Sequence, residues 1–291
     1  MKIAIGTAQF GMDYGLSNQF GKSEKNEVSK ILQYANQKGI SDIDTSPSYG
    51  DSEHVLGKVI NDYDFRMITK TPIFSDSSIS NFHSKVLNKS FYKSLSNFGK
   101  GDIYGLLIHS CDDLLKPGGE LLFKEMENLK STGRLEKIGV SVYNSSQIEL
   151  VLDRYNIDII QLPINIFDQQ LFVDGWLKKL KNKGIEIHAR SIFLQGLLLM
   201  HSADIPRYFS PILNKIKIFS KAAQNLSISK LELALNYVNG ISEIDKIVVG
   251  VNKFEQFNEI VNAKKITINP IDFVENSIKD PKYVNPSQWP L

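Results

Sequence analysis

The stretch Asp42–Gly57, DIDTSPSYGDSEHVLG, passes from a short apolar run through a polar loop into a segment with helical spacing. A strand followed by a loop and a helix is the repeating unit of an α/β fold. The loop is crowded with titratable groups, because it brings together Asp44, Tyr49 and Asp51. The meaning of this crowding depends on how often the unit recurs in the chain.

The same pattern recurs along the sequence. Runs rich in Ile and Val predict strands at residues 2–7, 42–46, 66–70, 104–110, 137–142, 159–165, 186–192 and 246–251. Amphipathic segments predict helices at residues 26–39, 52–60, 81–99, 120–133, 145–155, 177–184, 211–226 and 229–238. About eight strands, each followed by a helix over roughly 260 residues, predict an α/β fold of the (β/α)₈ TIM barrel type.

An open doubly wound sheet is the competing architecture. It would show a G-x-G-x-x-G fingerprint after its first strand, and residues 6–15, GTAQFGMDYG, lack that spacing. No linker divides the chain, so we expect a single barrel domain at residues 1–265. The proline-rich residues 266–291 end the periodic pattern, and we interpret them as a C-terminal tail packed over the barrel.

The composition is that of a folded protein, with 42% hydrophobic and 23% charged residues among 291. The formal net charge of +2 comes from 34 basic and 32 acidic side chains mixed along the chain, which argues against a nucleic-acid partner. No apolar run approaches the ~18 residues of a membrane span, and the N-terminus lacks a signal-peptide core. We therefore expect a cytoplasmic protein with no membrane partner.

The single cysteine, Cys111, excludes an intrachain disulfide and a cysteine-cluster metal site. It follows a predicted strand, where it is either a nucleophile or an inert small side chain. His54, His83, His188 and His201 are not spaced as metal ligands. We expect no metal site.

Four titratable side chains stand at the ends of successive predicted strands or in the loops that follow: Asp44, Tyr49, Lys70 and His109. In a barrel of this type the carboxyl ends of the strands surround one mouth, where active sites lie. Each residue alone has an ordinary interpretation, such as a helix cap, a surface lysine, a core histidine or a loop aromatic. Their joint appearance at one mouth favours a functional set.

The chemistry of these four side chains fits together. A tyrosine phenol, with an ordinary pKa near ~10, donates a proton poorly unless a neighbouring cation stabilises the phenolate. We expect Lys70 to be that cation, Asp44 to hold it in place, and His109 to donate to or orient a substrate carbonyl. Tyr49 would then be a general acid placed over that carbonyl.

The sequence resembles the aldo-keto reductase superfamily over nearly its whole length. The similar motifs are GTAQFG at 6–11, DTSPSYGDSEHVLG at 44–57, ITK at 68–70 and LLIHS at 106–110. The resemblance implies that Asp44, Tyr49, Lys70 and His109 form the catalytic tetrad of the family, with Tyr49 as the proton donor. It also implies a nicotinamide dinucleotide as the source of the hydride, which no side chain supplies.

The resemblance further implies which residues bind the dinucleotide. Ser141 and Gln161 resemble the positions that hydrogen-bond the carboxamide, with Asn144 and Asn165 nearby, whereas Val142 stands where relatives carry Asn. Arg190 occupies the position of an aromatic residue that stacks on the nicotinamide, and Ser191 follows it. The charge of Arg190 would either disfavour the oxidised ring, hold a phosphate or an anionic substrate, or pair with a nearby acid.

Residues 248–263 resemble the final cofactor segment, where a loop and a helix N-terminus hold the adenosine end and its phosphate. The matching residues are Gly250, Lys253, Gln256 and Glu259. Relatives often carry Arg in place of Gln256 and Asn in place of Ile260, although Lys253 would compensate as a point charge. We expect NADP(H) to be preferred, with NAD(H) possible.

The expected substrate is an aldehyde or ketone of a small polar molecule, such as a sugar or a sugar derivative. Its pocket would be formed by Phe10, Met12 and Tyr14, by residues 109–120, and by the tail, in which Trp289 either walls the pocket or packs outside the barrel. Two alternatives stay open. One is a non-catalytic, redox-sensing subunit that binds dinucleotide, and the other is an internal-redox enzyme of the epimerase or dehydratase kind.

Overall fold

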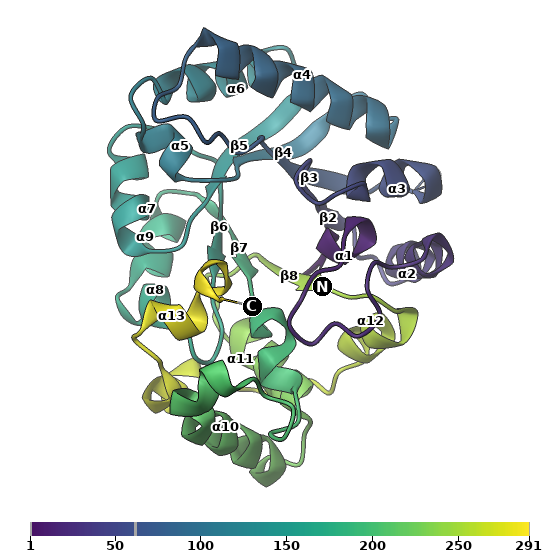
Figure 1. Ribbon diagram of the computed structural model, residues 1–291, viewed down its shortest axis with the longest axis vertical. Coiled ribbons are helices and arrows are strands. Elements are labelled where there is room, and N and C mark those ends of the chain that lie inside the picture. The colour runs from purple at the N-terminus through teal and green to yellow at the C-terminus, as the bar shows by residue number, and fades with distance from the viewer. Residues whose placement is uncertain (1, 61–62, 291) are drawn as a thin grey trace.

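The computed structural model describes residues 2–60 and 63–290. Eight parallel strands close into a barrel in the order β1 to β8, and β1 pairs with β8 (Figure 1). The strands are β1 Ile3–Gly6, β2 Asp42–Asp44, β3 Arg66–Lys70, β4 Ile103–Ile108, β5 Leu135–Ser141, β6 Ile159–Pro163, β7 Glu186–Arg190 and β8 Lys246–Gly250. The predicted (β/α)₈ TIM barrel is confirmed.

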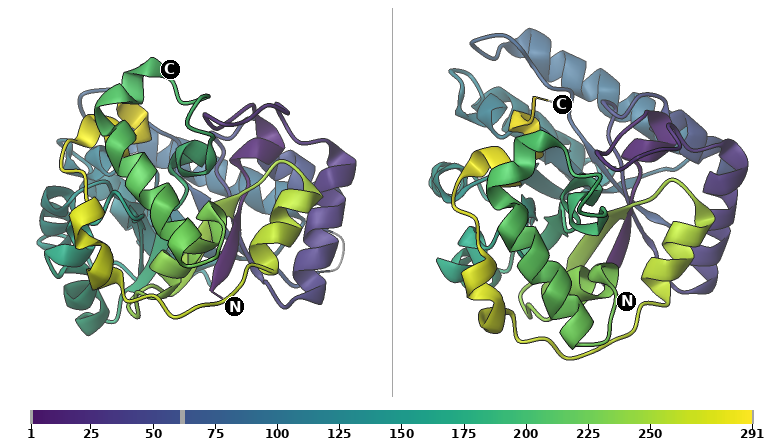
Figure 2. Two further views of the ribbon diagram at one scale, coloured as in Figure 1. Left: turned by 90° about the horizontal axis from the view of Figure 1, so that it is seen from below. Right: turned by 60° about the horizontal axis from the view of Figure 1, so that its bottom comes forward.

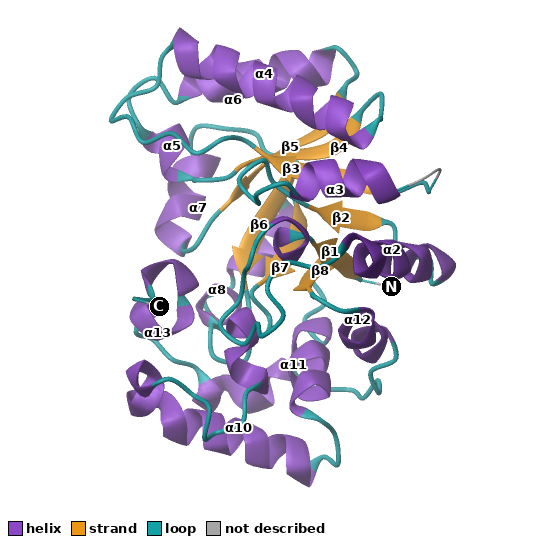
Figure 3. Ribbon diagram, turned by 45° about the vertical axis from the view of Figure 1, so that its right-hand side comes forward, coloured by secondary structure: helices purple, strands orange, loops and turns teal. Residues whose placement is uncertain are grey.

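Helices surround the strands on the outside of the barrel (Figure 3). The α-helices are α1 Ala8–Gly11, α2 Lys25–Gln37, α3 Ser52–Val59, α4 Asn81–Phe98, α5 Asp112–Leu115, α6 Glu120–Ser131, α7 Ser145–Leu152, α8 Gln170–Val173, α9 Trp176–Asn182, α10 Leu213–Asn225, α11 Lys230–Asn239, α12 Phe254–Val261 and α13 Pro281–Val284. The 3₁₀ helices are η1 Leu194–Leu199, η2 Arg207–Ile212, η3 Pro270–Asn276 and η4 Pro286–Gln288. Within the described residues, no helix has the length and apolar character that crossing a bilayer requires.

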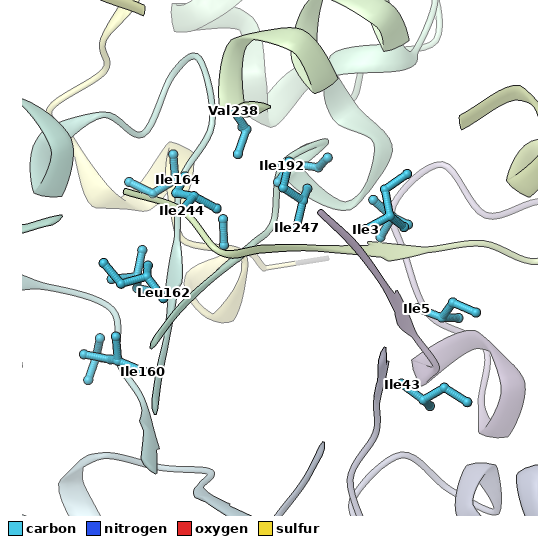
Figure 4. Packing of buried hydrophobic residues seen from close by; sticks show 14 of the residues in the cluster. Ile3, Ile5, Ile43, Ile160, Leu162, Ile164, Ile192, Val238, Ile244 and Ile247 are labelled. Carbon is cyan, nitrogen blue, oxygen red and sulfur yellow. The ribbon is translucent and has the colours of Figure 1, made fainter. Parts of the chain in front are cut away.

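The two faces of each strand have different roles. Side chains alternate along a strand, so Asp42 and Asp44 point to the inside of the barrel while Ile43 points to the helices. Figure 4 shows Ile43 and Ile160 in this outer layer of buried apolar side chains. A smaller cluster of Ile68, Leu107 and Ile159 fills the inside. The inside of the barrel therefore has polar side chains toward both ends of the strands and this apolar cluster between them.

The tail of residues 266–290 runs along the outside of the barrel and ends on the face opposite the N-terminus (Figure 2). Ile268 and Val284 are buried, and the backbone N–H of Ile278 donates to the carbonyl of Phe167 at 2.8 Å. Trp289 packs edge-to-face on Phe209 with ring centroids 4.9 Å apart. The tail is thus anchored by both apolar and backbone contacts.

The N-terminal end of the barrel is closed by a polar layer. Its side chains are Asp42, Arg66, Tyr104, Lys137, Glu186, His188 and Lys246. Glu186 accepts from the Tyr104 hydroxyl and pairs with His188 Nε2, each at 2.7 Å, and it also pairs with Lys137. Burial alone would raise the pKa of Glu186, but the hydrogen bonds from His188, Lys137 and Tyr104 outweigh it and hold that pKa far below its ordinary value.

This layer makes a prediction about stability. A depressed carboxyl pKa contributes stability above the ordinary glutamate pKa, and that contribution is lost as the pH falls. We expect Glu186→Gln to lower the unfolding free energy at pH 7 by about 2–3 kcal/mol, because three charge-assisted contacts are weakened. Urea unfolding between pH 7 and pH 3 should also show a shallower acid-induced loss than in the parent. The exposed Glu136→Gln on β5 is the control, and identical pH profiles for parent and Glu186→Gln would contradict the prediction.

Candidate active site

A cavity of about 670 Å³ opens at the carboxyl ends of the strands. We call it the mouth cavity. Of the predicted site residues, it is lined by Asp44, Tyr49, Lys70, His109, Ser141, Gln161, Arg190, Ser191, Gly250, Gln256 and Glu259. Lys253 does not line it; its ammonium lies 5.6 Å from the ring centroid of Phe20. Together with Gly6 of β1, the barrel therefore gathers residues from all eight strand ends around one space of the size that small-molecule sites have.

The deepest part of the mouth cavity holds a buried ion pair. Lys70 Nζ lies 2.7 Å from Asp44 Oδ1 and donates to the Thr45 carbonyl at 2.9 Å. Gln161 Nε2 donates to the other Asp44 oxygen at 2.7 Å. Burial alone would lower the pKa of Lys70, but Asp44, together with Tyr49, reverses this and raises it, so the ammonium stays charged.

Tyr49 stands over this pair. Its ring centroid lies 5.0 Å from Lys70 Nζ, and its ring meets that of His109 edge-on at 5.8 Å. Burial raises the pKa of the Tyr49 phenol, Lys70 acts in the opposite direction, and Asp44 adds to the rise. We expected Lys70 to make the phenol more acidic; it does oppose the rise, but burial outweighs it. The phenol therefore holds its proton at neutral pH.

His109 is neutral under the same conditions. Burial, and then the charge of Lys70, lower its pKa to about 3. Its Nδ1 lies 3.2 Å from Ser46 Oγ, which itself accepts from the Ser48 backbone N–H. A Ser46 hydroxyl that donates to Nδ1 leaves the proton on Nε2, so a neutral histidine offers one N–H donor to the cavity.

Two glycines allow the loop that carries Tyr49 to approach the end of α1. A Cβ atom at Gly11 would lie 1.8 Å from the Tyr49 carbonyl oxygen. Gly50 has a φ of +57°, and a Cβ there would lie 2.2 Å from the Gly11 carbonyl oxygen. Side chains at either position would push the two loops apart. The glycines in the two motifs are thus required by the close contact that positions Tyr49.

Ser52 and Glu53 anchor the same loop from behind. The Ser52 hydroxyl donates to the Thr7 carbonyl at 2.9 Å. The buried Glu53 carboxylate accepts from Thr69 Oγ1 at 2.7 Å and from Ser94 Oγ at 2.9 Å, which joins α3 to β3 and α4. The crowded loop therefore combines residues that face the mouth cavity with residues that fix its position.

Arg190 faces the mouth cavity from the end of β7. Its Nη2 donates to the Val142 carbonyl at 3.0 Å, and its guanidinium stacks on the Tyr143 ring, 4.2 Å from the centroid. Its Nη1 lies 3.4 Å from Ser191 Oγ. Within residues 2–60 and 63–290, no carboxylate oxygen lies within 4.0 Å of its guanidinium nitrogens. Of the three interpretations of Arg190, the structure excludes a direct ion pair with an acid.

The N-terminus of α12 is already capped by protein groups. Gln256 Oε1 accepts from the backbone N–H of Asn252 at 2.8 Å and of Lys253 at 3.2 Å. Glu27 Oε2 accepts from the N–H of Phe254 at 2.9 Å. Glu259 lies one turn further along and lines the mouth cavity. The backbone N–H groups of Asn252, Lys253 and Phe254 are thus occupied by protein acceptors, and the Glu27 carboxylate lies beside them.

Ser141 and Gln161 suit a polar ligand. The Ser141 hydroxyl and Gln161 Oε1 have no hydrogen-bond partner among the described residues, and both residues line the mouth cavity. One donor and one acceptor side by side fit an amide. By contrast, Asn144 caps α7 through Gln147, and the buried Asn165 braces its own loop. These two asparagines are not available to a cofactor.

Several sequence expectations about the substrate pocket are wrong. Phe10 is fully buried in the core because α1 turns it inward, and Met12 lies outside the cavity lining. Of residues 109–120 only His109 lines the cavity, because α5 carries the others away. Trp289 packs on Phe209, while Pro286 and Ser287 line the cavity instead. Cys111 is buried, and this burial raises the pKa of its thiol to about 12, which favours the interpretation of an inert small side chain.

The loop after β7 crosses the mouth, which sequence reasoning missed. The Gln195 carbonyl accepts from the Ser17 backbone N–H at 3.3 Å, and a Cβ at Gly196 would lie 1.7 Å from Ser17 Oγ. Ser191 and Gln195 have φ values of 60° and 51°. Such left-handed residues cluster at ligand sites. The Gln-Gly pair after a strand end was the available signal.

The fold and the mouth cavity define a (β/α)₈ barrel with a polar small-molecule site at the carboxyl ends of its strands. A family model described as the aldo/keto reductase family matches residues 2–276. The chain therefore belongs to the aldo/keto reductase family, and it is an oxidoreductase of that family.

Two curated proteins are similar in sequence over most of this chain. The chain is 24% identical over 307 residues to the uncharacterized oxidoreductase YqkF of Bacillus subtilis (strain 168), covering 97% of this chain and 98% of the relative. It is 24% identical over 282 residues to the NADH-specific methylglyoxal reductase of Escherichia coli (strain K12), covering 84% of each.

Two solved structures are similar in fold. An aldo-keto reductase from Bacillus halodurans, in its holo form, has a TM-score of 0.76 at 18% identity, covering 99% of this chain and 95% of that one. The glycerol dehydrogenase of Gluconobacter oxydans has a TM-score of 0.71 at 19% identity, covering 100% and 93%. Both matches extend over the whole barrel.

Proposed function

We propose that the protein reduces an aldehyde or ketone of a small polar molecule to an alcohol, with a nicotinamide dinucleotide as cofactor and Tyr49 as proton donor. The observation that carries the proposal is the Tyr49 phenol over the buried Asp44–Lys70 pair, at 5.0 Å from the Lys70 ammonium. A proton donor beside a fixed cation is the arrangement that protonates a carbonyl oxygen as negative charge develops there.

Each of the four side chains has a separate task. Tyr49 gives its proton to the carbonyl oxygen, and the Lys70 charge stabilises the phenolate that is left. Asp44, held by Gln161, keeps Lys70 charged and in place. Neutral His109 orients the carbonyl through its N–H. Ser141 and Gln161 would hold the carboxamide of the dinucleotide, which supplies the hydride when bound.

The test is a titration of the purified protein with NADH and NADPH, followed by turnover assays with aldehydes, ketones and sugars. Consumption of reduced dinucleotide with an equal amount of alcohol formed supports the reductase. Binding without turnover would favour a redox-sensing subunit. Substrate conversion without net consumption of dinucleotide would favour an internal-redox enzyme.

We further propose that NAD(H) is the preferred cofactor, which reverses the preference that the sequence suggested. The N–H groups at the start of α12 are capped by Gln256 and Glu27, and Glu259 adds a carboxylate at the cavity. A 2′-phosphate placed at the start of α12 would meet the carboxylates of Glu27 and Glu259, whereas Lys253, the cation at this helix end, does not line the cavity. The NADH-specific relative in Escherichia coli supports the same preference.

We expect NADH to bind about tenfold more tightly than NADPH, a difference of about 1.4 kcal/mol. Glu259→Gln should bring the dissociation constants of NADH and NADPH closer together, because it removes a negative charge from the cavity wall. Glu255→Gln, an exposed residue of the same helix that does not line the cavity, is the matched control. Fluorescence titration measures both constants, and tighter binding of NADPH by the parent protein would refute the preference.

A further inference from the structure

We propose that Arg190 binds an anionic group of the substrate, so that the natural substrate is a carbonyl compound carrying a carboxylate or a phosphate. This inference rests on the proposed function, because it concerns the molecule that Tyr49 would protonate. It goes further in naming the chemical class of that molecule and the side chain that selects it.

The first support is the balance of charge in the mouth cavity. The Lys70 ammonium is neutralised by Asp44 at 2.7 Å. Arg190 is the other lysine or arginine of the described lining, and it takes part in no ion pair among the described residues. An arginine that faces a cavity without a carboxylate partner is a site for an anion supplied from outside.

The second support is the way the guanidinium is held. The Val142 carbonyl and Ser191 Oγ engage two of its N–H groups, and the Tyr143 ring covers one face. A guanidinium has five N–H donors, so three are left for a ligand. Because the side chain is held before a ligand arrives, less conformational entropy is lost on binding.

The third support is the position of Arg190 relative to Tyr49 and His109. All three line the same cavity. Burial and Lys70 lower the pKa of His109, and the charge of Arg190 is among the groups that act on both His109 and Tyr49. Because all three side chains line one cavity, a single small molecule can place its anionic group on Arg190 and its carbonyl oxygen at Tyr49.

Asp168 is an acid on which the charge of Arg190 acts. Burial raises its pKa to about 7, with Arg190 acting in the opposite direction. Among the described residues no ion pair joins the Asp168 carboxyl to the Arg190 guanidinium, so Asp168 does not occupy the N–H donors of Arg190. A nicotinamide ring is a poorer partner for Arg190 than a carboxylate, because a fixed positive charge opposes the charge that the ring gains on oxidation.

The test compares acids with their methyl esters, which differ little in shape but carry no charge. The probes are 4-oxobutanoate and 4-formylbenzoate, each with its methyl ester, at neutral pH and low ionic strength. We expect kcat/KM for the acid to exceed that for the ester by about tenfold or more. In Arg190→Gln this ratio should fall to about one, because kcat/KM for the acid falls while kcat/KM for the ester stays the same.

Two further variants sharpen the comparison. Arg190→Lys keeps the charge but not the fork of donors, so it should retain part of the preference. Arg154→Gln, an exposed arginine next to α7 and outside the cavity lining, removes an equal charge and should leave the acid-to-ester ratio unchanged. Dinucleotide titration of Arg190→Gln should give dissociation constants within about threefold of the parent values, because the cofactor does not depend on this side chain.

Each outcome decides the matter. Equal kcat/KM values for acid and ester in the parent protein overturn the inference. If Arg190→Gln binds the dinucleotide more weakly and loses kcat/KM equally for acid and ester, Arg190 serves the cofactor. That result overturns the inference as well. If no carbonyl compound is reduced, the proposed function fails separately. Calorimetric titration with 4-formylbenzoate and its ester then still tests whether Arg190 selects an anion.

Discussion

Tyr49→Phe is expected to lower kcat for carbonyl reduction by about a thousandfold, within the range that a positioned general acid contributes. The change removes only the hydroxyl group that stands over Lys70, while the ring keeps its edge-on contact with His109. The dissociation constant of the dinucleotide should stay within about twofold of the parent value, because the change removes no expected contact between the protein and the dinucleotide. Steady-state kinetics and fluorescence titration measure the two effects separately.

Tyr14→Phe is the matched control for this prediction. Tyr14 also lines the mouth cavity, but its hydroxyl accepts a hydrogen bond from Gln195 Nε2 at 3.3 Å, and among the described residues no lysine pairs with its ring as Lys70 does with that of Tyr49. Loss of this hydroxyl should keep most of the rate. Because burial keeps the Tyr49 phenol protonated at neutral pH, the effect of Tyr49→Phe should be the same throughout the neutral range. Turnover by Tyr49→Phe at the parent rate would show that another group is the proton donor.

The barrel itself could be predicted from the sequence because burial on two faces leaves a clear pattern. The strand β3 was predicted at its observed bounds. Its adjacent residues Met67 and Ile68 are both apolar because Met67 packs against the helices and Ile68 packs inside the barrel. The same alternation put Asp44 and Lys70 on the inner face, where they meet. Elements and faces follow from short-range periodicity.

The partners of the polar side chains could not be predicted in this way. Glu27 caps the N–H of Phe254 across 227 residues of sequence, and Gln161 donates to Asp44 across 117. A sequence pattern shows which face a side chain occupies but not which distant group it meets. For this reason the α12 segment suggested an open phosphate site, whereas the structure has it capped.

Lys70→Met is the second change with a large expected effect, because it breaks a buried ion pair. Lys70 and Asp44 have exposed fractions of 2% and 3%. Removal of one partner leaves the other charge buried and uncompensated, which costs about 3–5 kcal/mol of unfolding free energy. Turnover should also fall, by about a hundredfold or more, because no cation is left to stabilise the Tyr49 phenolate. Urea unfolding and steady-state kinetics measure the two losses.

The double variant Asp44→Asn, Lys70→Met separates the structural task of the pair from its chemical task. With both charges gone, no uncompensated charge is buried, so stability should return to within about 1 kcal/mol of the parent. The rate should stay low, because the cation beside Tyr49 is still missing. A double variant that regained both stability and rate would show that Lys70 serves only to neutralise Asp44. A double variant that is stable but slow would show that the charge of Lys70 takes part in the reaction in the mouth cavity.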